Sequence, residues 1–98
     1  MPQYPYQVEV FANANKSALE ISAATVVKAA PGFVATISVL DPGSSDGGLY
    51  DASEVSPLTG KGISVIPQVA GTYTINFPVS NGIVVVPGTG QVVSISFS

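Results

Sequence analysis

Three aspartates recur at five-residue intervals in a glycine-rich stretch, and they are the side chains of this chain best suited to binding chemistry. Asp41, Asp46 and Asp51 could place carboxylate oxygens around a calcium ion, which prefers oxygen ligands. Their spacing does not match an EF-hand loop, which needs ligands at alternate positions and a bidentate Glu at the twelfth. The favoured interpretation is a solvated loop of Asx-turns, with the three aspartates kept as weak calcium candidates.

The residue types that carry ordinary catalysis are scarce in the 98 residues. There is no His and no Cys, so none of the twelve serines has its usual activating base. The glycine-rich stretch at 59–62 fails as a Walker A loop, because Val55 and Gly62 stand where that loop needs a Gly and a Ser or Thr. We therefore predict a protein that is not an enzyme, with no catalytic residue and no cofactor.

Charge is unusually sparse and limits the classes of partner. Charged residues make up 9% of the chain and the net charge is −3, against roughly 25% charged residues in an average soluble domain. Lys16, Lys28 and Lys61 are the only basic residues, too few for the positive surface that nucleic acid or an anionic membrane requires. We expect neither a nucleic-acid nor a membrane partner.

The same scarcity predicts extended neutral surfaces. A globule of this mass exposes about 5,200 Å², so nine charges leave roughly one per 580 Å². Free monomers usually keep contiguous apolar patches below about 300 to 600 Å². We favour burial of part of this surface in an oligomer or larger assembly; the alternative is a monomer whose neutral surface consists of Ser, Thr, Asn and Gln.

The first residues predict an extended arm. Residues 1–6 hold two prolines and lead into the first strand of a single domain over 7–98. Tyr4 and Tyr6 share one face of that strand, and Phe11 interrupts its polar face. An arm stiffened by proline can lie across a neighbouring subunit at low entropic cost, so these three aromatic residues are interface candidates. Packing on its own domain and disorder are the alternatives for the arm.

Residues 17–30 fit two kinds of secondary structure. Apolar residues alternate there as in a strand, while Ser17 and Glu20 match a helical capping box. We favour strand, because residues 30–33 (APGF) fit a type II turn that would return the chain as an antiparallel neighbour. Phe33 would then begin a strand with inward-facing residues at every second position.

The rest of the chain alternates between strand patterns and turn formers. Asn81-Gly82 predicts a type I′ hairpin turn. The uninterrupted apolar run that follows it predicts burial on both faces, by a second sheet and by a neighbouring subunit. Its four residues are the remaining interface candidates: Ile83, Val84, Val85 and Val86.

About eight strands, spaced at roughly ten residues with Gly and Pro between them, predict an all-β fold. We expect an antiparallel β-sandwich that is jelly-roll-like. The last strand has the clearest alternation, with Val93, Ile95 and Phe97 inward and serines outward.

The order of several short motifs resembles a family of small structural proteins from tailed bacteriophages. The most specific part is the tail, where NFP at 76–78 is followed by NGIVVVPGTGQVV at 81–93 and SFS at 96–98. VVKAAPG at 26–32 and LYDA at 49–52 extend the resemblance to roughly residues 24–98.

The resemblance implies a capsid-associated virion protein, either a decoration (cement) protein or the base of a head fibre. Such a protein would be made in the host cytoplasm and sit on the capsid exterior as a homo-oligomer, with a trimer favoured, bound to the major capsid protein. Two alternatives remain open: a tail or baseplate component, and a receptor- or carbohydrate-binding module displayed on the virion. The resemblance brings no catalytic residue with it.

Overall fold

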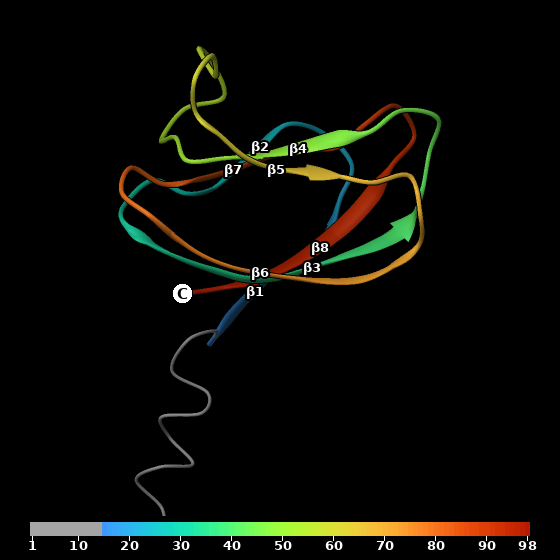
Figure 1. The fold of residues 1–98 in the computed structure, drawn as a ribbon, viewed down its shortest axis with the longest axis horizontal. Coiled ribbons are helices and arrows are strands. Elements are labelled where there is room, and N and C mark those ends of the chain that lie inside the picture. Colours follow the sequence, from blue (N-terminus) through green and yellow to red (C-terminus); the bar gives the residue numbers. More distant parts are fainter. Residues whose placement is uncertain (1–14) are drawn as a thin grey trace, which may run out of the picture.

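The computed structural model describes residues 15–98, which form eight strands and no helix (Figure 1). The strands are β1 (Lys16–Ile21), β2 (Thr25–Lys28), β3 (Gly32–Asp41), β4 (Gly47–Tyr50), β5 (Gly62–Ile66), β6 (Gly71–Val79), β7 (Ile83–Val86) and β8 (Val92–Phe97). Residues 1–6, with the predicted arm and its Tyr4 and Tyr6, lie outside the described residues, as does Phe11.

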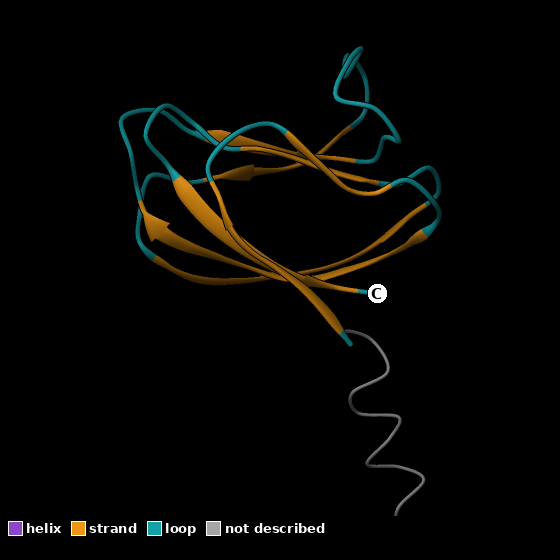
Figure 2. Ribbon diagram, turned by 180° about the vertical axis from the view of Figure 1, so that it is seen from behind, coloured by secondary structure: helices purple, strands orange, loops and turns teal. Residues whose placement is uncertain are grey.

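The strands form two antiparallel four-stranded sheets that face one another (Figure 2). The first sheet has the order β1-β8-β3-β6 and the second the order β2-β7-β4-β5. This β-sandwich-like arrangement confirms the all-β antiparallel prediction, and it decides residues 17–30 in favour of strand over helix. The eight described strands match the predicted number because 17–30 forms two of them, while the strand predicted to begin at residue 7 lies outside the described residues.

Alternating aliphatic side chains from both sheets fill the space between them. On β8, Val93, Ile95 and Phe97 are buried as predicted, and Leu49 and Val85 meet them from the second sheet. Burying each such side chain contributes about 1.5 to 3 kcal/mol, and in a chain without cysteines this packing and the strand ladders hold the fold.

The segment 17–30 is two strands rather than one. β1 lies in the first sheet, and after a break at residues 22–24 the chain crosses to the second sheet as β2. A bulge in β1, where Glu20 has a φ of 53°, leaves Leu19 71% exposed while Ile21 is buried. The simple alternation, which would put Leu19 and Ile21 on one face, is therefore wrong at this point.

Both predicted turns are wrong in the same way. β2 and β3 lie in different sheets, and so do β6 and β7. Residues 30–33 and Asn81-Gly82 therefore connect the two sheets and close no hairpin. Neither Gly32 nor Gly82 has the positive φ that the predicted turn types require. Local turn signals mark where a chain reverses, but they do not specify which sheet receives it.

Bulges also change which residues of β3 and β6 face the core. The register between β3 and β6 shifts near Val34, and Asn76 in β6 has a φ of 50°. Val34 is completely buried where Phe33, now half-buried, was expected in the core. Phe77 remains 43% exposed on β6, an edge strand of the first sheet.

Candidate functional site

The three aspartates serve different parts of the fold. Asp41 accepts a hydrogen bond from the backbone N–H of Gly43 at 3.0 Å, which is an Asx-turn. Asp51 faces the connection between β6 and β7, and no hydrogen bond brings it to Asp46. Within residues 15–98 no group of three or more acidic, His or Cys side chains is arranged to hold a metal ion.

Asp51 anchors one end of the sandwich. Its carboxylate accepts hydrogen bonds from the backbone N–H groups of Ser80, Asn81 and Gly82, at 3.0, 2.8 and 3.3 Å. Burial by itself raises the pKa of the Asp51 carboxyl, but the three backbone donors and then the charge of Lys61 lower it, and the net pKa lies below 3.8. The carboxylate therefore stays ionised and holds the crossing in place of the predicted hairpin turn.

We expect calcium to leave the stability of the described fold unchanged. A ligand at a hundredfold excess over its dissociation constant would raise the free energy of unfolding by about 2.7 kcal/mol. Thermal unfolding with and without millimolar calcium measures this effect. A calcium-dependent rise in Tm, or terbium luminescence sensitised by the protein, would show that the aspartates do bind a cation.

The apolar run of β7 is buried by the chain's own residues. Ile83, Val84 and Val85 have no exposed surface, and Val86 is half-buried. Ile83 and Val85 belong to the core between the sheets, which places Val84 on the outer side of β7, a central strand of the second sheet. Of these four interface candidates, only Val86 keeps surface for a partner.

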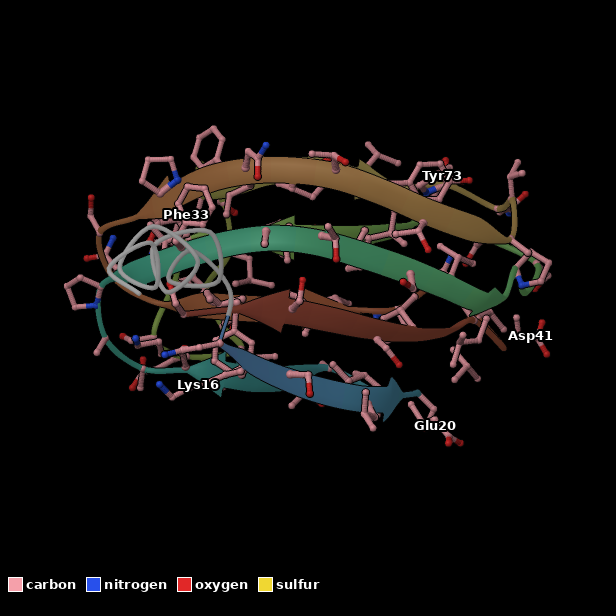
Figure 3. The ribbon with its side chains drawn as sticks, turned by 90° about the horizontal axis from the view of Figure 1, so that it is seen from below. Lys16, Glu20, Phe33, Asp41 and Tyr73 are labelled. Carbon is pink, nitrogen blue, oxygen red and sulfur yellow. The ribbon has the colours of Figure 1, made fainter. Side chains whose placement is uncertain are left out.

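The outer face of the first sheet is built from rows of hydroxyl groups. One row crosses all four strands in register, and a second runs one pleat further along β8, β3 and β6. We call this surface the hydroxyl face (Figure 3); it consists of Ser17, Ser96, Thr36 and Thr74 in the first row and Ser94, Ser38 and Thr72 in the second.

Most hydroxyls of this face are already partnered within the chain. Thr36 and Ser96 share a hydrogen bond of 2.7 Å between their hydroxyl oxygens, and Ser38 lies 3.1 Å from Thr72 in the same way. Ser94 accepts a hydrogen bond from the bulged backbone of β1. These rows are therefore polar and largely satisfied within the chain, while Leu19 and Leu40 on strands of the same sheet stay 71% and 54% exposed.

The outer face of the second sheet carries two rows of apolar side chains. One row runs Val26, Val84 and Tyr50 across β2, β7 and β4, and the next runs Val86, Gly48 and Val65 across β7, β4 and β5. Val26 is 38% and Val65 62% exposed. We call the surface formed by Val26, Tyr50, Val65 and Val86 the valine–tyrosine face.

The tyrosine ring lies along the strand over a glycine. A Cβ placed on Gly48 would come 2.6 Å from the Tyr50 hydroxyl oxygen and 2.7 Å from its Cε1. Only glycine therefore lets the ring lie this close to the sheet. Gly62, beside Tyr50 on β5, would meet the ring at 4.0 Å and is otherwise open. The centre of the valine–tyrosine face is thus an aromatic ring lying against its own sheet.

Charges of the described residues lie around these two faces and not within them. Lys16 and Glu20 belong to edge strand β1, and Asp41 ends β3 (Figure 3). Lys28 ends β2, and the remaining charges are in the connections between strands. The central surfaces of both sheets are uncharged, one through hydroxyls and the other through aliphatic and aromatic groups.

Sequence reasoning missed the buried polar centre at the other end of the sandwich. Gln91 is completely buried, donates hydrogen bonds from Nε2 to the carbonyls of Ile66 and Pro67, and accepts one from Gly88 N–H at 3.0 Å. The neighbouring Thr89 backbone bonds to the β3–β4 connection. In the sequence, Gln91 only ends a glycine-rich turn, so no local pattern predicts that its side chain is buried and hydrogen-bonded.

No helix in the described part of the chain is long and apolar enough to cross a membrane. Comparison of the chain with protein-family models, with curated proteins and with solved structures found no match.

Proposed function

We propose that this chain is a non-enzymatic structural subunit that works by assembling with other proteins through uncharged surfaces. The observation that carries the proposal is the placement of charge. The eight described charged residues lie at strand ends, in connections or on an edge strand, and the outer faces of both sheets are left neutral. A neutral face can be buried against another protein without leaving an unpaired charge in the interface, and burying an unpaired charge is costly.

The strand order supports the finer description of the fold as a jelly roll. β1 pairs with β8, β2 with β7, β3 with β6 and β4 with β5, and these pairs alternate between the two sheets. That pattern is one long hairpin folded over into two sheets, as in the jelly rolls of viral capsid domains. A capsid role agrees with this topology and with the sequence resemblance.

As the specific setting we propose the exterior of a tailed-phage capsid. There the chain would be a decoration or cement protein, an oligomer with a trimer favoured, bound to the major capsid protein. Its work would be mechanical, because many symmetric copies multiply weak contacts into a shell that resists internal pressure. Nucleic acid and membrane are not among the proposed partners, since basic residues number three.

The stability of phage particles that lack the protein tests this setting. We expect heads without it to burst at lower temperature, or on addition of a chelator, while adsorption to the host is unchanged. Adding purified protein back should restore the resistance of the heads to heat and chelator. An antibody that labels tails and not heads would contradict the capsid role and favour the tail or baseplate alternative.

A carbohydrate-binding module is the second candidate, favoured by the Tyr50 ring lying over Gly48. Sugar rings stack on flat aromatic surfaces, and this ring is half-exposed on a sheet face. A glycan array with wild-type protein and Tyr50→Ala tests it. Binding that disappears in the variant, together with loss of host adsorption by particles lacking the protein, would favour this candidate over the cement role.

Deleting residues 2–6 is expected to weaken assembly. The prolines and tyrosines of this segment would add contact area at low entropic cost if it lies across a neighbour. Light scattering of the full chain and the deletion at matched concentrations measures the effect. An unchanged mass would remove the segment from the interface.

A further inference from the structure

We propose that Asn81 and Gly82 form a site of spontaneous deamidation, which the Asp51 carboxylate keeps closed while the crossing between β6 and β7 is in place. The proposal does not depend on the assembly function proposed above. It rests on the residue pair itself, on the hydrogen bonds that Asp51 accepts from it and on the burial of Gly82.

The chemistry needs only this residue pair and water. The backbone nitrogen of Gly82 attacks the side-chain amide carbon, Cγ, of Asn81. A new C–N bond forms, the bond from Cγ to the amide nitrogen breaks, and ammonia leaves with the proton of the Gly82 N–H. Water then opens the resulting succinimide ring at either of its two bonds between nitrogen and a carbonyl carbon, so residue 81 becomes aspartate or isoaspartate.

The sequence favours this reaction at a single place. A side chain on the residue after Asn shields the attacking nitrogen, and glycine has no side chain. Of the asparagines in the chain, only Asn81 precedes a glycine; the others are Asn13, Asn15 and Asn76. Asn81 is also exposed, so water reaches its side-chain amide.

Hydrogen bonds hold the attacking nitrogen in the folded chain. The N–H groups of Gly82 and Asn81 donate to Asp51 Oδ1 at 3.3 and 2.8 Å, and the Ser80 N–H donates to Oδ2 at 3.0 Å. Closing the succinimide ring removes the proton of the Gly82 N–H, so its bond to Asp51 is lost in the reaction. Asp51, whose pKa lies below 3.8, is too weak a base to take that proton itself.

Backbone packing restrains the same position. Gly82 is buried, and a Cβ placed on it would collide with the carbonyl oxygens of Lys28 and Ala52. The peptide unit between Asn81 and Gly82 therefore has little room to reorient while these segments stay in contact. We expect deamidation to proceed through local opening of the crossing and not in its closed state.

The modification prevents the crossing from closing again as before. Both products place a carboxylate at residue 81, next to the carboxylate of Asp51, and like charges this close repel. Isoaspartate also adds a methylene to the backbone of the crossing. Deamidation of Asn81 thus converts a transient opening at this end of the sandwich into a lasting one.

The rate of deamidation at Asn81 tests the proposal. Full chains are incubated at neutral pH and room temperature, and peptide mapping by mass spectrometry separates the Asn, aspartate and isoaspartate forms. We expect folded wild type to react at least about 100-fold more slowly than the same chain unfolded in urea. Asp51→Ala should accelerate the reaction of the folded chain about 5- to 30-fold, because it raises the population of the open crossing.

Three further variants separate local opening from other effects. Asp51→Asn keeps the size of the side chain and should also accelerate the reaction, which covers an alanine variant that does not fold. Glu54→Gln removes an exposed charge from the connection that Asp51 begins and should react as wild type does. Gln91→Ala weakens the other end of the sandwich and should stay within about twofold of wild type. Thermal unfolding verifies that each variant is folded at the temperature used.

Three results would overturn the proposal. Folded wild type that deamidates as fast as the unfolded chain would show that the fold does not close the site. Folded Asp51 variants that react no faster than wild type would remove Asp51 from its control. Acceleration by Gln91→Ala as large as that by Asp51→Ala would show that unfolding of the whole domain, and not opening of the crossing, exposes Asn81.

Discussion

Replacing Gln91 by alanine is expected to lower the free energy of unfolding by about 2 to 4 kcal/mol, and Tm by roughly 10 to 20 °C. The side chain is completely buried and joins the end of β5, the following Pro67 and the β7–β8 connection through three hydrogen bonds. Its removal leaves a buried N–H and two carbonyls without their partner, and opens a cavity at the same place. Urea unfolding followed by circular dichroism measures the loss.

Two further variants separate hydrogen bonding from volume at this site. Gln91→Met keeps most of the volume and loses the bonds, so we expect it to retain most of the destabilisation. Thr89→Ala changes an exposed side chain in the same connection while keeping its backbone bonds, and should stay within about 0.5 kcal/mol of wild type. A Gln91→Met protein as stable as wild type would show that Gln91 acts only by filling space.

Replacing Asp51 by alanine is expected to cost about 1 to 2 kcal/mol at neutral pH. The carboxylate holds three backbone N–H groups of the crossing between β6 and β7, and these donors would turn to water or stay unpaired without it. Glu54→Gln removes an exposed charge from the β4–β5 connection, which Asp51 begins; it is the matched control and should have little effect.

The contribution of Asp51 should depend on pH with a definite sign. Its pKa in the folded protein lies below 3.8, so the ionised carboxylate stabilises the fold at pH values above about 3.8. That contribution is lost as the pH falls from there through the folded pKa. Urea unfolding of wild type and Asp51→Asn between pH 7 and pH 2 should show a stability difference that shrinks in this window. A difference that stays constant down to pH 2 would contradict the role of the charge.

The sequence predicts strands well because alternation is a local signal. The run from Val92 to Phe97 shows this, since each expected inward residue is buried. Alternation fails where the backbone inserts a residue, as at Glu20 and Asn76, whose positive φ values reset which face follows. Neither residue is a glycine, so the pattern gives no warning of the bulge.

The pairing of strands and the two polar anchors are beyond local reasoning. Asn81-Gly82 has the composition of a hairpin turn, yet Asp51, about thirty residues away, holds it as a crossing between sheets. Gln91 depends in the same way on β5 and its following residue. Such roles are defined by contacts distant in sequence and appear only once the fold is known.

The candidate surfaces, too, are only partly predictable from the sequence. Low charge predicts that neutral faces exist, but which residues share a face follows only from register. The row Ser17, Ser96, Thr36 and Thr74 combines four separate strands. The sequence predicted a partner contact for residues 83–86, but Ile83, Val84 and Val85 are completely buried within a single chain.

The central claim is that copies of this chain assemble with one another through uncharged surface, and the mass of the chain in solution tests that claim most directly. Static light scattering of the purified full chain, taken up to about 1 mM, should give a mass that rises above 9.9 kDa with concentration, toward three times that value for the favoured trimer. A mass that remains at 9.9 kDa over the whole range would contradict self-assembly of the chain.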